Sequence, residues 1–193
     1  MILTISGTPG SGKSTIAKIL LFKLGAERRY VGGIRRDLAR EKGMTLAELN
    51  EYAQTHPETD VDVDHNVAAR ARNLEGQGKL VIVEGRTQYH FLPESIKIYV
   101  KCDLTEGAKR IWRDLQDQDK QAERNEGKAI TSLKEMVGEL QQRQQNDLRR
   151  YQKYYGIDPS AESQYELVVD TSAISAEQAA EKILAYLQEK AYK

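Results

Sequence analysis

The feature that most constrains this chain is a glycine-rich octapeptide, GTPGSGKS, at residues 7–14. It matches the phosphate-binding pattern G-x-x-x-x-G-K-[ST] at every fixed position. A short β-type run over residues 2–5 precedes it, and apolar residues at helical spacing follow from Ile16 to Leu24. This order of strand, loop and helix is the context that the pattern requires, because the loop N–H groups and the helix N-terminus then point at phosphate oxygens.

The octapeptide predicts a site for ATP and Mg²⁺. We expect Lys13 to bridge the β- and γ-phosphates and the Ser14 hydroxyl to ligate Mg²⁺. Glu84 directly follows an apolar run, at the sheet edge where ligands bind in open α/β folds, so it is a second candidate for Mg²⁺. A strand-end acid exposed to water is the open alternative for Glu84. The residues expected to hold ATP are Gly7, Gly10, Ser11, Gly12, Lys13, Ser14 and Thr15.

Strand-like and helix-like patterns alternate along the whole chain. Apolar strand-like runs lie at 2–5, 80–83, 96–100 and 167–169, with a weaker one at 29–31. Helical periodicity covers 34–42, 46–54, 62–74, 105–115, 131–155 and 176–189. Continuous apolar strands separated by helices predict a parallel sheet covered on both faces, in a three-layer α/β domain. The polar stretch 114–128 is expected to be an exposed segment or a solvated helix end.

Composition narrows the function further. The 193 residues carry 29 basic and 29 acidic side chains, and this zero net charge argues against a dedicated nucleic-acid binder. The length fits one domain, 1–193, and no apolar run reaches the roughly 18 residues of a membrane span. Residues 1–6 do not have the pattern of a signal peptide, so we expect a cytoplasmic protein. The lone Cys102 is expected to pack in the core.

Arginines are placed where a second phosphate group could bind. Phosphoryl transfer between two nucleotides gathers several negative charges, and arginine suits them because its planar fork binds phosphate in a bidentate way. Arg36 lies near the start of a predicted helix, and Arg86 lies two residues beyond Glu84. Both are candidates to hold a monophosphate.

The long helix predicted at 131–155 offers a third set. Arg143, Asp147 and Arg150 are spaced i, i+4 and i+7, about 100° around the helix from its apolar stripe. This places them on one face at the edge of the core, where a cleft wall is expected. A surface ion pair between Arg143 and Asp147 is the open alternative.

Several segments together resemble the archaeal-type cytidylate kinases, within the nucleoside monophosphate kinases. They are GTPGSGKST at 7–15, GGIRRDLA at 32–39, VEGR at 83–86 and RYQKYYGID at 150–158. The resemblance covers nearly the entire chain. It implies a P-loop kinase fold with a five-stranded parallel sheet, a helical monophosphate-binding segment over 33–75 and a lid over 114–130. The implied reaction is direct phosphoryl transfer from ATP to CMP or dCMP by a monomeric enzyme that uses Mg²⁺.

The resemblance also assigns roles to individual residues. The residues given catalytic roles are Lys13, Arg36, Arg86, Arg124, Arg143 and Arg150. Those expected to bind the acceptor are Arg36, Asp64, Arg86, Arg143, Asp147 and Arg150. Asp60 and Asp64 are candidates to accept a hydrogen bond from the cytosine N4 amine. An acidic, solvated helix face is the alternative interpretation of these two aspartates.

Several positions depart from the family pattern, among them Thr87-Gln88-Tyr89, which replaces the usual run of small residues after Arg86. Gly33, Arg35 and Gly107 stand where the family usually has Asp, an aromatic residue and Arg. Residues 114–123 also resemble an insertion. CMP, dCMP and UMP therefore stay open as acceptors. Two other functions stay open as well: another nucleotide or metabolite kinase of the same fold, and a nucleotide-binding regulatory protein without turnover.

Overall fold

The computed structural model describes residues 1–117 and 130–191, which form a five-stranded parallel sheet with helices on both faces. The order of the strands is β2-β3-β1-β4-β5. All four neighbouring pairs are parallel, which confirms the predicted sheet. The strands are β1 (Ile2–Gly7), β2 (Glu27–Tyr30), β3 (Val81–Glu84), β4 (Ile96–Lys101) and β5 (Leu167–Asp170).

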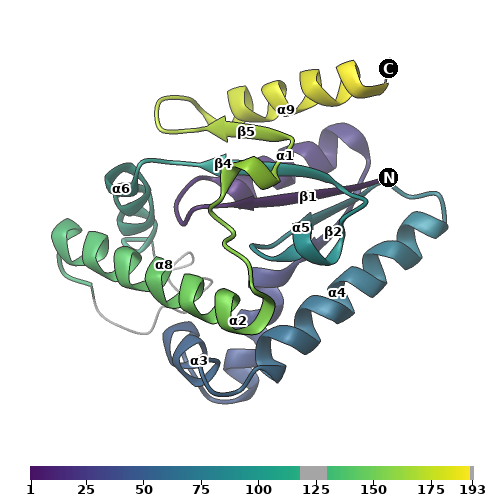
Figure 1. The fold of residues 1–193 in the computed structure, drawn as a ribbon. Helices are drawn as coiled ribbons and strands as arrows, with labels where there is room; N and C mark the ends of the chain where they lie inside the picture. Colours follow the sequence, from purple (N-terminus) through teal and green to yellow (C-terminus); the bar gives the residue numbers. More distant parts are fainter. Residues whose placement is uncertain (118–129, 192–193) are drawn as a thin grey trace.

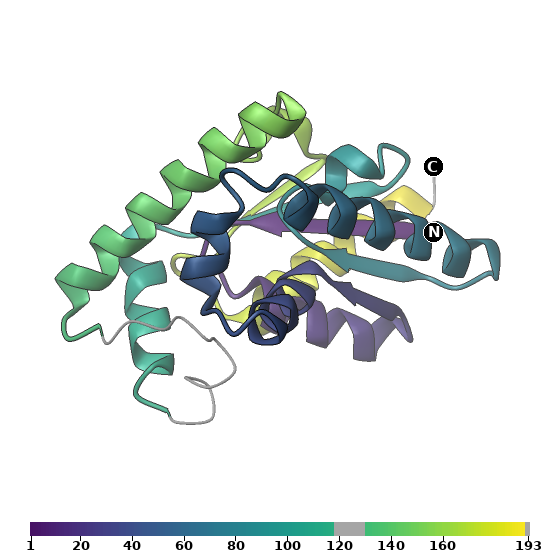
Figure 2. The same cartoon turned by 90° about the horizontal axis from the view of Figure 1, so that it is seen from below.

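Helices cover the two faces of the sheet. The helices are α1 (Lys13–Leu24), α2 (Val31–Glu41), α3 (Leu46–Tyr52), α4 (Glu58–Gly76), α5 (Gln88–Phe91), α6 (Leu104–Asp114), α8 (Leu133–Tyr155) and α9 (Ala176–Ala191), with a 3₁₀ turn η1 (Glu162–Gln164). In Figure 1, α9 lies above the strands, whereas α4 and α8 lie below them. Figure 2 shows α6 beside the N-terminal half of α8. These layers confirm the predicted three-layer α/β fold.

The core follows the two-residue period of the strands. Leu3 and Ile5 face a buried cluster that α1 and α9 complete, whereas Val81 and Val83 face a second cluster completed by α4. Because successive side chains of a strand point to opposite faces, one sheet supplies both clusters. Cys102 is buried after β4, as expected.

The edge strand β2 differs from its prediction. The sequence predicts a strand at 29–31, but β2 spans Glu27–Tyr30 and Val31 already begins α2. All four residues of β2 are only half-buried, and three of them are charged, so the apolar signal of a central strand is missing. Gly32 and Gly33 likewise weaken the helical signal at the start of α2.

Two short elements, α5 and η1, were not predicted because a single turn is too short to show periodicity. The predicted lid at 114–130 falls largely on residues 118–129, which lie outside the described residues, as does Arg124. No helix among the described residues is long and apolar enough to cross a bilayer.

Candidate active site

The carboxyl edge of the sheet carries a cavity of about 440 Å³ around the glycine-rich loop. We call it the donor cavity. Its wall includes residues 7–15 and so contains all seven residues that were predicted to hold ATP. Arg110, Arg113, Thr171, Ile174 and Ser175 also line it. The loop residues that the sequence singles out are therefore brought together around one cavity.

The loop keeps its shape through glycine and close backbone packing. Gly12 caps α1 with φ of 79°, in the left-handed region that favours glycine. A Cβ at Gly10 would lie 2.5 Å from the Gly107 Cα atom, and one at Gly107 would lie 2.7 Å from the Pro9 carbonyl oxygen. The start of α6 therefore packs directly on the loop. This contact explains why glycine, and not arginine, stands at position 107.

A smaller cavity of about 110 Å³ adjoins the donor cavity. We call it the acceptor cavity; α2, α3, α4, α8 and the end of β3 contribute to its wall. Its wall includes all six residues expected to bind the acceptor. They are Arg36, Asp64, Arg86, Arg143, Asp147 and Arg150. The residues that line both cavities are Lys13, Tyr30, Arg36, Arg86 and Arg143. Four cations thus lie where the two cavities meet.

Glu84 is fully buried beneath the glycine-rich loop, so the alternative of a solvated strand-end acid is wrong. Its Oε1 atom accepts from Lys13 Nζ at 2.9 Å and from Ser14 Oγ at 2.5 Å, and its Oε2 atom pairs with Arg28. Burial alone would raise the pKa of Glu84, but Lys13, Ser14 and Arg28 outweigh it and lower the pKa to about 2. The carboxylate is therefore ionised at neutral pH.

The loop fits a magnesium-bound triphosphate. Ser14 Oγ and Glu84 Oε1 are hard oxygen donors that lie 2.5 Å apart, and Ser14 lines the donor cavity whereas Glu84 lines the adjoining acceptor cavity. Ser11 Oγ is buried in the loop and has no hydrogen-bond partner in the described part of the chain. A hydroxyl of this kind can donate to a phosphate oxygen.

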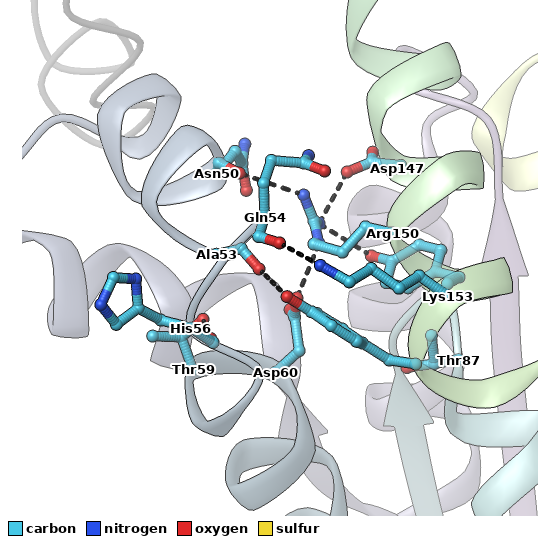
Figure 3. A network of polar contacts seen from close by, with 12 residues as sticks. Asn50, Ala53, Gln54, His56, Thr59, Asp60, Thr87, Asp147, Arg150 and Lys153 are labelled. Carbon is cyan, nitrogen blue, oxygen red and sulfur yellow. Dashed lines mark hydrogen bonds and ion pairs between the residues drawn. The ribbon is translucent and has the colours of Figure 1, made fainter.

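Five alternating charges connect the end of β3 to α8, α4 and α2. Arg86 pairs with Asp147, and Asp147 Oδ1 accepts from Arg150 at 2.8 Å. Arg150 Nε lies 2.6 Å from Asp60 Oδ2, and Asp60 also pairs with Arg35. Figure 3 shows Arg150 between Asp147 and Asp60. The chain of charges joins the predicted monophosphate-binding segment to the long helix.

The burial of Asp60, Asp64 and Asp147 contradicts the two alternatives in which these residues lie at the solvent-exposed surface. Asp60 and Asp64 are each only 3% exposed, so an acidic solvated face on α4 is wrong. Asp147 is also buried, and its partners Arg86 and Arg150 replace the surface ion pair with Arg143 that its spacing allowed. Arg150 is 1% exposed, deeper than the edge of the core where the helical spacing placed it.

Arg86 and Asp64 both titrate abnormally. Burial, with Arg143 close by, lowers the pKa of Arg86 to about 10, so its side chain stays charged at neutral pH. Burial raises the pKa of Asp64 to about 6, although Thr87 and Tyr155 donate hydrogen bonds to it at 2.8 and 2.9 Å. Asp64 therefore lines the acceptor cavity, and hydrogen bonds from Thr87 and Tyr155 fix its carboxylate.

Several residues that line the two cavities were not predicted from the sequence. In the donor cavity, Arg110 donates to the Thr171 carbonyl oxygen at 2.7 Å, and Thr171 Oγ1 donates to the Ser11 carbonyl oxygen at 2.9 Å. Thr171 directly follows β5, so its place at the carboxyl edge of a strand could have indicated it. The other residues missed are Arg113, Ile174, Tyr30 and Asn50. They carry no local pattern that marks a site.

The parallel sheet, the glycine-rich loop and the shared cationic wall define a P-loop kinase. A family model described as an AAA domain, AAA_18, matches residues 3–131. The chain is 33% identical to the cytidylate kinase of Archaeoglobus fulgidus, over 100% of this chain and 98% of that one. It is 37% identical to the cytidylate kinase of Methanothrix thermoacetophila, over 89% and 88% of the two chains. The chain belongs to the archaeal-type cytidylate kinase family.

Solved structures agree with this fold. A putative kinase from Chloroflexus aurantiacus gives a TM-score of 0.60 at 13% identity, over 95% of this chain and 96% of that one. Shikimate kinase from Acinetobacter baumannii gives 0.56 at 17% identity, over 100% and 95%. Identities this low support the shared fold alone.

Proposed function

We propose that this protein is an ATP-dependent kinase that transfers the γ-phosphoryl group of ATP to CMP or dCMP. The observation that carries the proposal is the junction of the two cavities at Lys13, Arg36, Arg86 and Arg143. Two phosphate chains brought together there would meet a fixed wall of cations, which is the main requirement of phosphoryl transfer. Membership in the cytidylate kinase family supports CMP as the acceptor.

In the proposed reaction, a phosphate oxygen of CMP attacks the γ-phosphorus of ATP. The new oxygen–phosphorus bond gives CDP, the bond to the β–γ bridging oxygen breaks, and ADP leaves with that oxygen. Lys13 holds the β- and γ-phosphates, whereas Arg36 and Arg86 hold the acceptor phosphate. Arg143, which lines both cavities, stabilises the charge on the transferred group. No covalent enzyme intermediate is required.

Mg²⁺ belongs to the same proposal. Ser14 and Glu84 would hold it directly or through water, and the bound ion would neutralise charge on the β- and γ-phosphates. Because the pKa of Glu84 is about 2, its carboxylate is available at any physiological pH. When nucleotide binds, Lys13 would exchange its contact with Glu84 for one with phosphate.

Recognition of the acceptor base and ribose is proposed for the inner wall of the acceptor cavity. Asp64 faces this cavity and could accept from the cytosine N4 amine. Asp147 and Arg150, which lie on the same wall, are proposed to hold the acceptor phosphate and ribose, partly through their contacts with Arg86 and with each other. The lid at 114–130 with Arg124, the single domain over 1–193, a monomeric state and a cytoplasmic location all stay predictions.

An acceptor panel tests the proposal. Purified protein is supplied with ATP and Mg²⁺ and then separately with CMP, dCMP, UMP, AMP and shikimate, and the products are separated by chromatography. We expect ADP and a nucleoside diphosphate in equal amounts, with CMP or dCMP giving the highest kcat/KM. Turnover with shikimate alone would favour a metabolite kinase, and tight ATP binding without any transfer would favour a regulatory protein.

A further inference from the structure

Tyr30 lies at the junction of the two cavities. It is the last residue of β2 and the residue that precedes α2, and its side chain lines both the donor and the acceptor cavity. Neither the phosphate-loop pattern nor the spacing of the arginines points to it. A tyrosine here places one hydroxyl among the four cations that the cavities share.

The Tyr30 hydroxyl contacts the arginine that is proposed to hold the acceptor phosphate. Arg36 Nη1 donates to Tyr30 Oη at 2.5 Å and to the Gly32 carbonyl oxygen at 3.2 Å. These two acceptors lie on β2 and on the first turn of α2, so they fix the direction of a long and otherwise flexible side chain. The hydrogen bond to Tyr30 therefore helps to orient the guanidinium group of Arg36.

The Tyr30 ring is itself held in place. The guanidinium carbon of Arg28 lies 4.3 Å from the ring centre, in a cation–π contact, and Arg28 pairs with Glu84. A Cβ at Gly32 or Gly33 would lie 2.8 or 2.7 Å from ring atoms, so the ring packs closely on the first turn of α2. This contact gives a reason for glycine at position 33, where the family usually has Asp.

We propose that Tyr30 is a positioning residue for the acceptor phosphate. Its hydroxyl holds Arg36 at the boundary between the cavities, and Arg28 and the glycine pair hold the ring that carries this hydroxyl. The inference rests on the proposed function, because it assigns Arg36 to a nucleoside monophosphate. It adds a link through β2 between Glu84, which contacts Lys13 and Ser14 of the glycine-rich loop, and Arg36.

The Tyr30→Phe variant tests the hydroxyl while keeping the ring. We expect KM and the calorimetric Kd for CMP to rise about 10-fold, which is the effect of losing one hydrogen bond to a charged group. The KM for ATP and the thermal midpoint should stay close to the wild-type values. Tyr89→Phe is the matched control, because Tyr89 is buried but lines neither cavity; it should leave both constants unchanged.

A double substitution separates positioning from a general structural effect. In an Arg36→Met background, Tyr30→Phe should have no further effect on the KM for CMP, because the side chain that it orients is gone. An equal effect in both backgrounds, or a KM for CMP in Tyr30→Phe within twofold of the wild type, would overturn the inference.

The glycine contact gives an independent variant that keeps the hydroxyl. Gly33→Ala adds a methyl group against the ring and should raise the KM for CMP several-fold by displacing Tyr30. Gly138→Ala, at a helical glycine of α8 with open space around it, is the control and should not change the KM. An unchanged KM in Gly33→Ala would also count against the inference. If the wild type turns over a different monophosphate and not CMP, the proposed acceptor fails, and the same comparisons are made with that monophosphate.

Discussion

Lys13 carries the most direct residue-level prediction. Its ammonium group lies on the donor cavity and contacts Glu84, so Lys13→Ala removes the cation expected to bridge the β- and γ-phosphates. We expect kcat to fall roughly 100- to 1000-fold, as when one preorganised donor is removed from an active site. Circular dichroism should show a folded protein, because Glu84 keeps Ser14 and Arg28 as partners.

The control for this variant is Lys18→Ala, an exposed lysine on the same helix. Its turnover should equal that of the wild type. Wild-type activity in Lys13→Ala would contradict the assignment of the glycine-rich loop to ATP.

The second residue-level prediction concerns Asp64 and the pH dependence of folding stability. Its pKa of about 6 in the folded protein lies above the ordinary 3.8, so the folded state binds this proton more tightly than the unfolded state. Asp64 therefore lowers stability above about pH 6, and this penalty disappears as the pH falls from 6 towards 4. The difference is worth about 3 kcal/mol.

The Asp64→Asn variant removes this titration. We expect the free energy of unfolding of the wild type, relative to that of Asp64→Asn, to be lower at pH 7 than at pH 4 by roughly 2 kcal/mol, as measured by urea denaturation. The protein can accommodate the new amide of this variant through Gln88. The Gln88 Nε2 atom donates to Asp64 Oδ1, and its Oε1 atom has no partner among the described residues, so a rotated Gln88 side chain could accept from the amide NH₂ group. Parallel pH dependences in the two proteins would show that Asp64 titrates normally.

At the scale of the element, α4 and α8 are joined through Asp60. Removing its carboxylate leaves Arg35 and Arg150 buried with one partner fewer each. We expect Asp60→Ala to destabilise the protein by about 3 kcal/mol, because buried cations are costly without their counter-charge. Asp62→Ala, at an exposed position of the same helix, should change the stability by less than about 0.5 kcal/mol. Equal midpoints of urea denaturation in the two variants would contradict this view of the chain of charges.

The long helix also contacts the residues that directly follow α3. Lys153 donates to the Gln54 carbonyl oxygen at 2.8 Å, and Tyr154 donates to the Ala53 carbonyl oxygen at 2.6 Å. Figure 3 shows the contact between Lys153 and Gln54 beside Arg150. The two contacts satisfy carbonyl groups just beyond the end of α3, where a helix leaves its last acceptors without partners. The predicted monophosphate-binding segment therefore contacts α8 both through these two hydrogen bonds and through the ion pair between Asp60 and Arg150.

The elements differ in how far the sequence could predict them. β1, β3 and β4 were predictable because buried parallel strands read as continuous apolar runs, and the glycine-rich loop because its backbone geometry requires particular residues at fixed spacing. The edge strand β2 was only partly found, because its half-buried charged residues lack that signal. The burial of Asp60 and Asp64 could not be predicted from local sequence patterns. It depends on partners that are distant in sequence, such as Arg35 and Thr87.

At the scale of the whole molecule, the two cavities must be occupied together. A single ligand in which adenosine and cytidine are joined by five phosphates would reach from one cavity to the other across the shared cations. We expect one molecule to bind per chain, at least about 100-fold more tightly than CMP, because linking two ligands makes the second binding event intramolecular. Titration calorimetry measures this directly. Affinity no better than that of ATP alone would show that the two cavities do not act as one site.

The central claim is direct transfer of the γ-phosphoryl group from ATP to CMP. Its most direct test supplies ATP labelled in the γ-phosphate together with CMP and Mg²⁺, and then locates the label by chromatography. Our account predicts one labelled CDP for each ADP formed, with no label on the protein and no release without CMP. Label recovered as inorganic phosphate, on the protein or on no acceptor at all would contradict it.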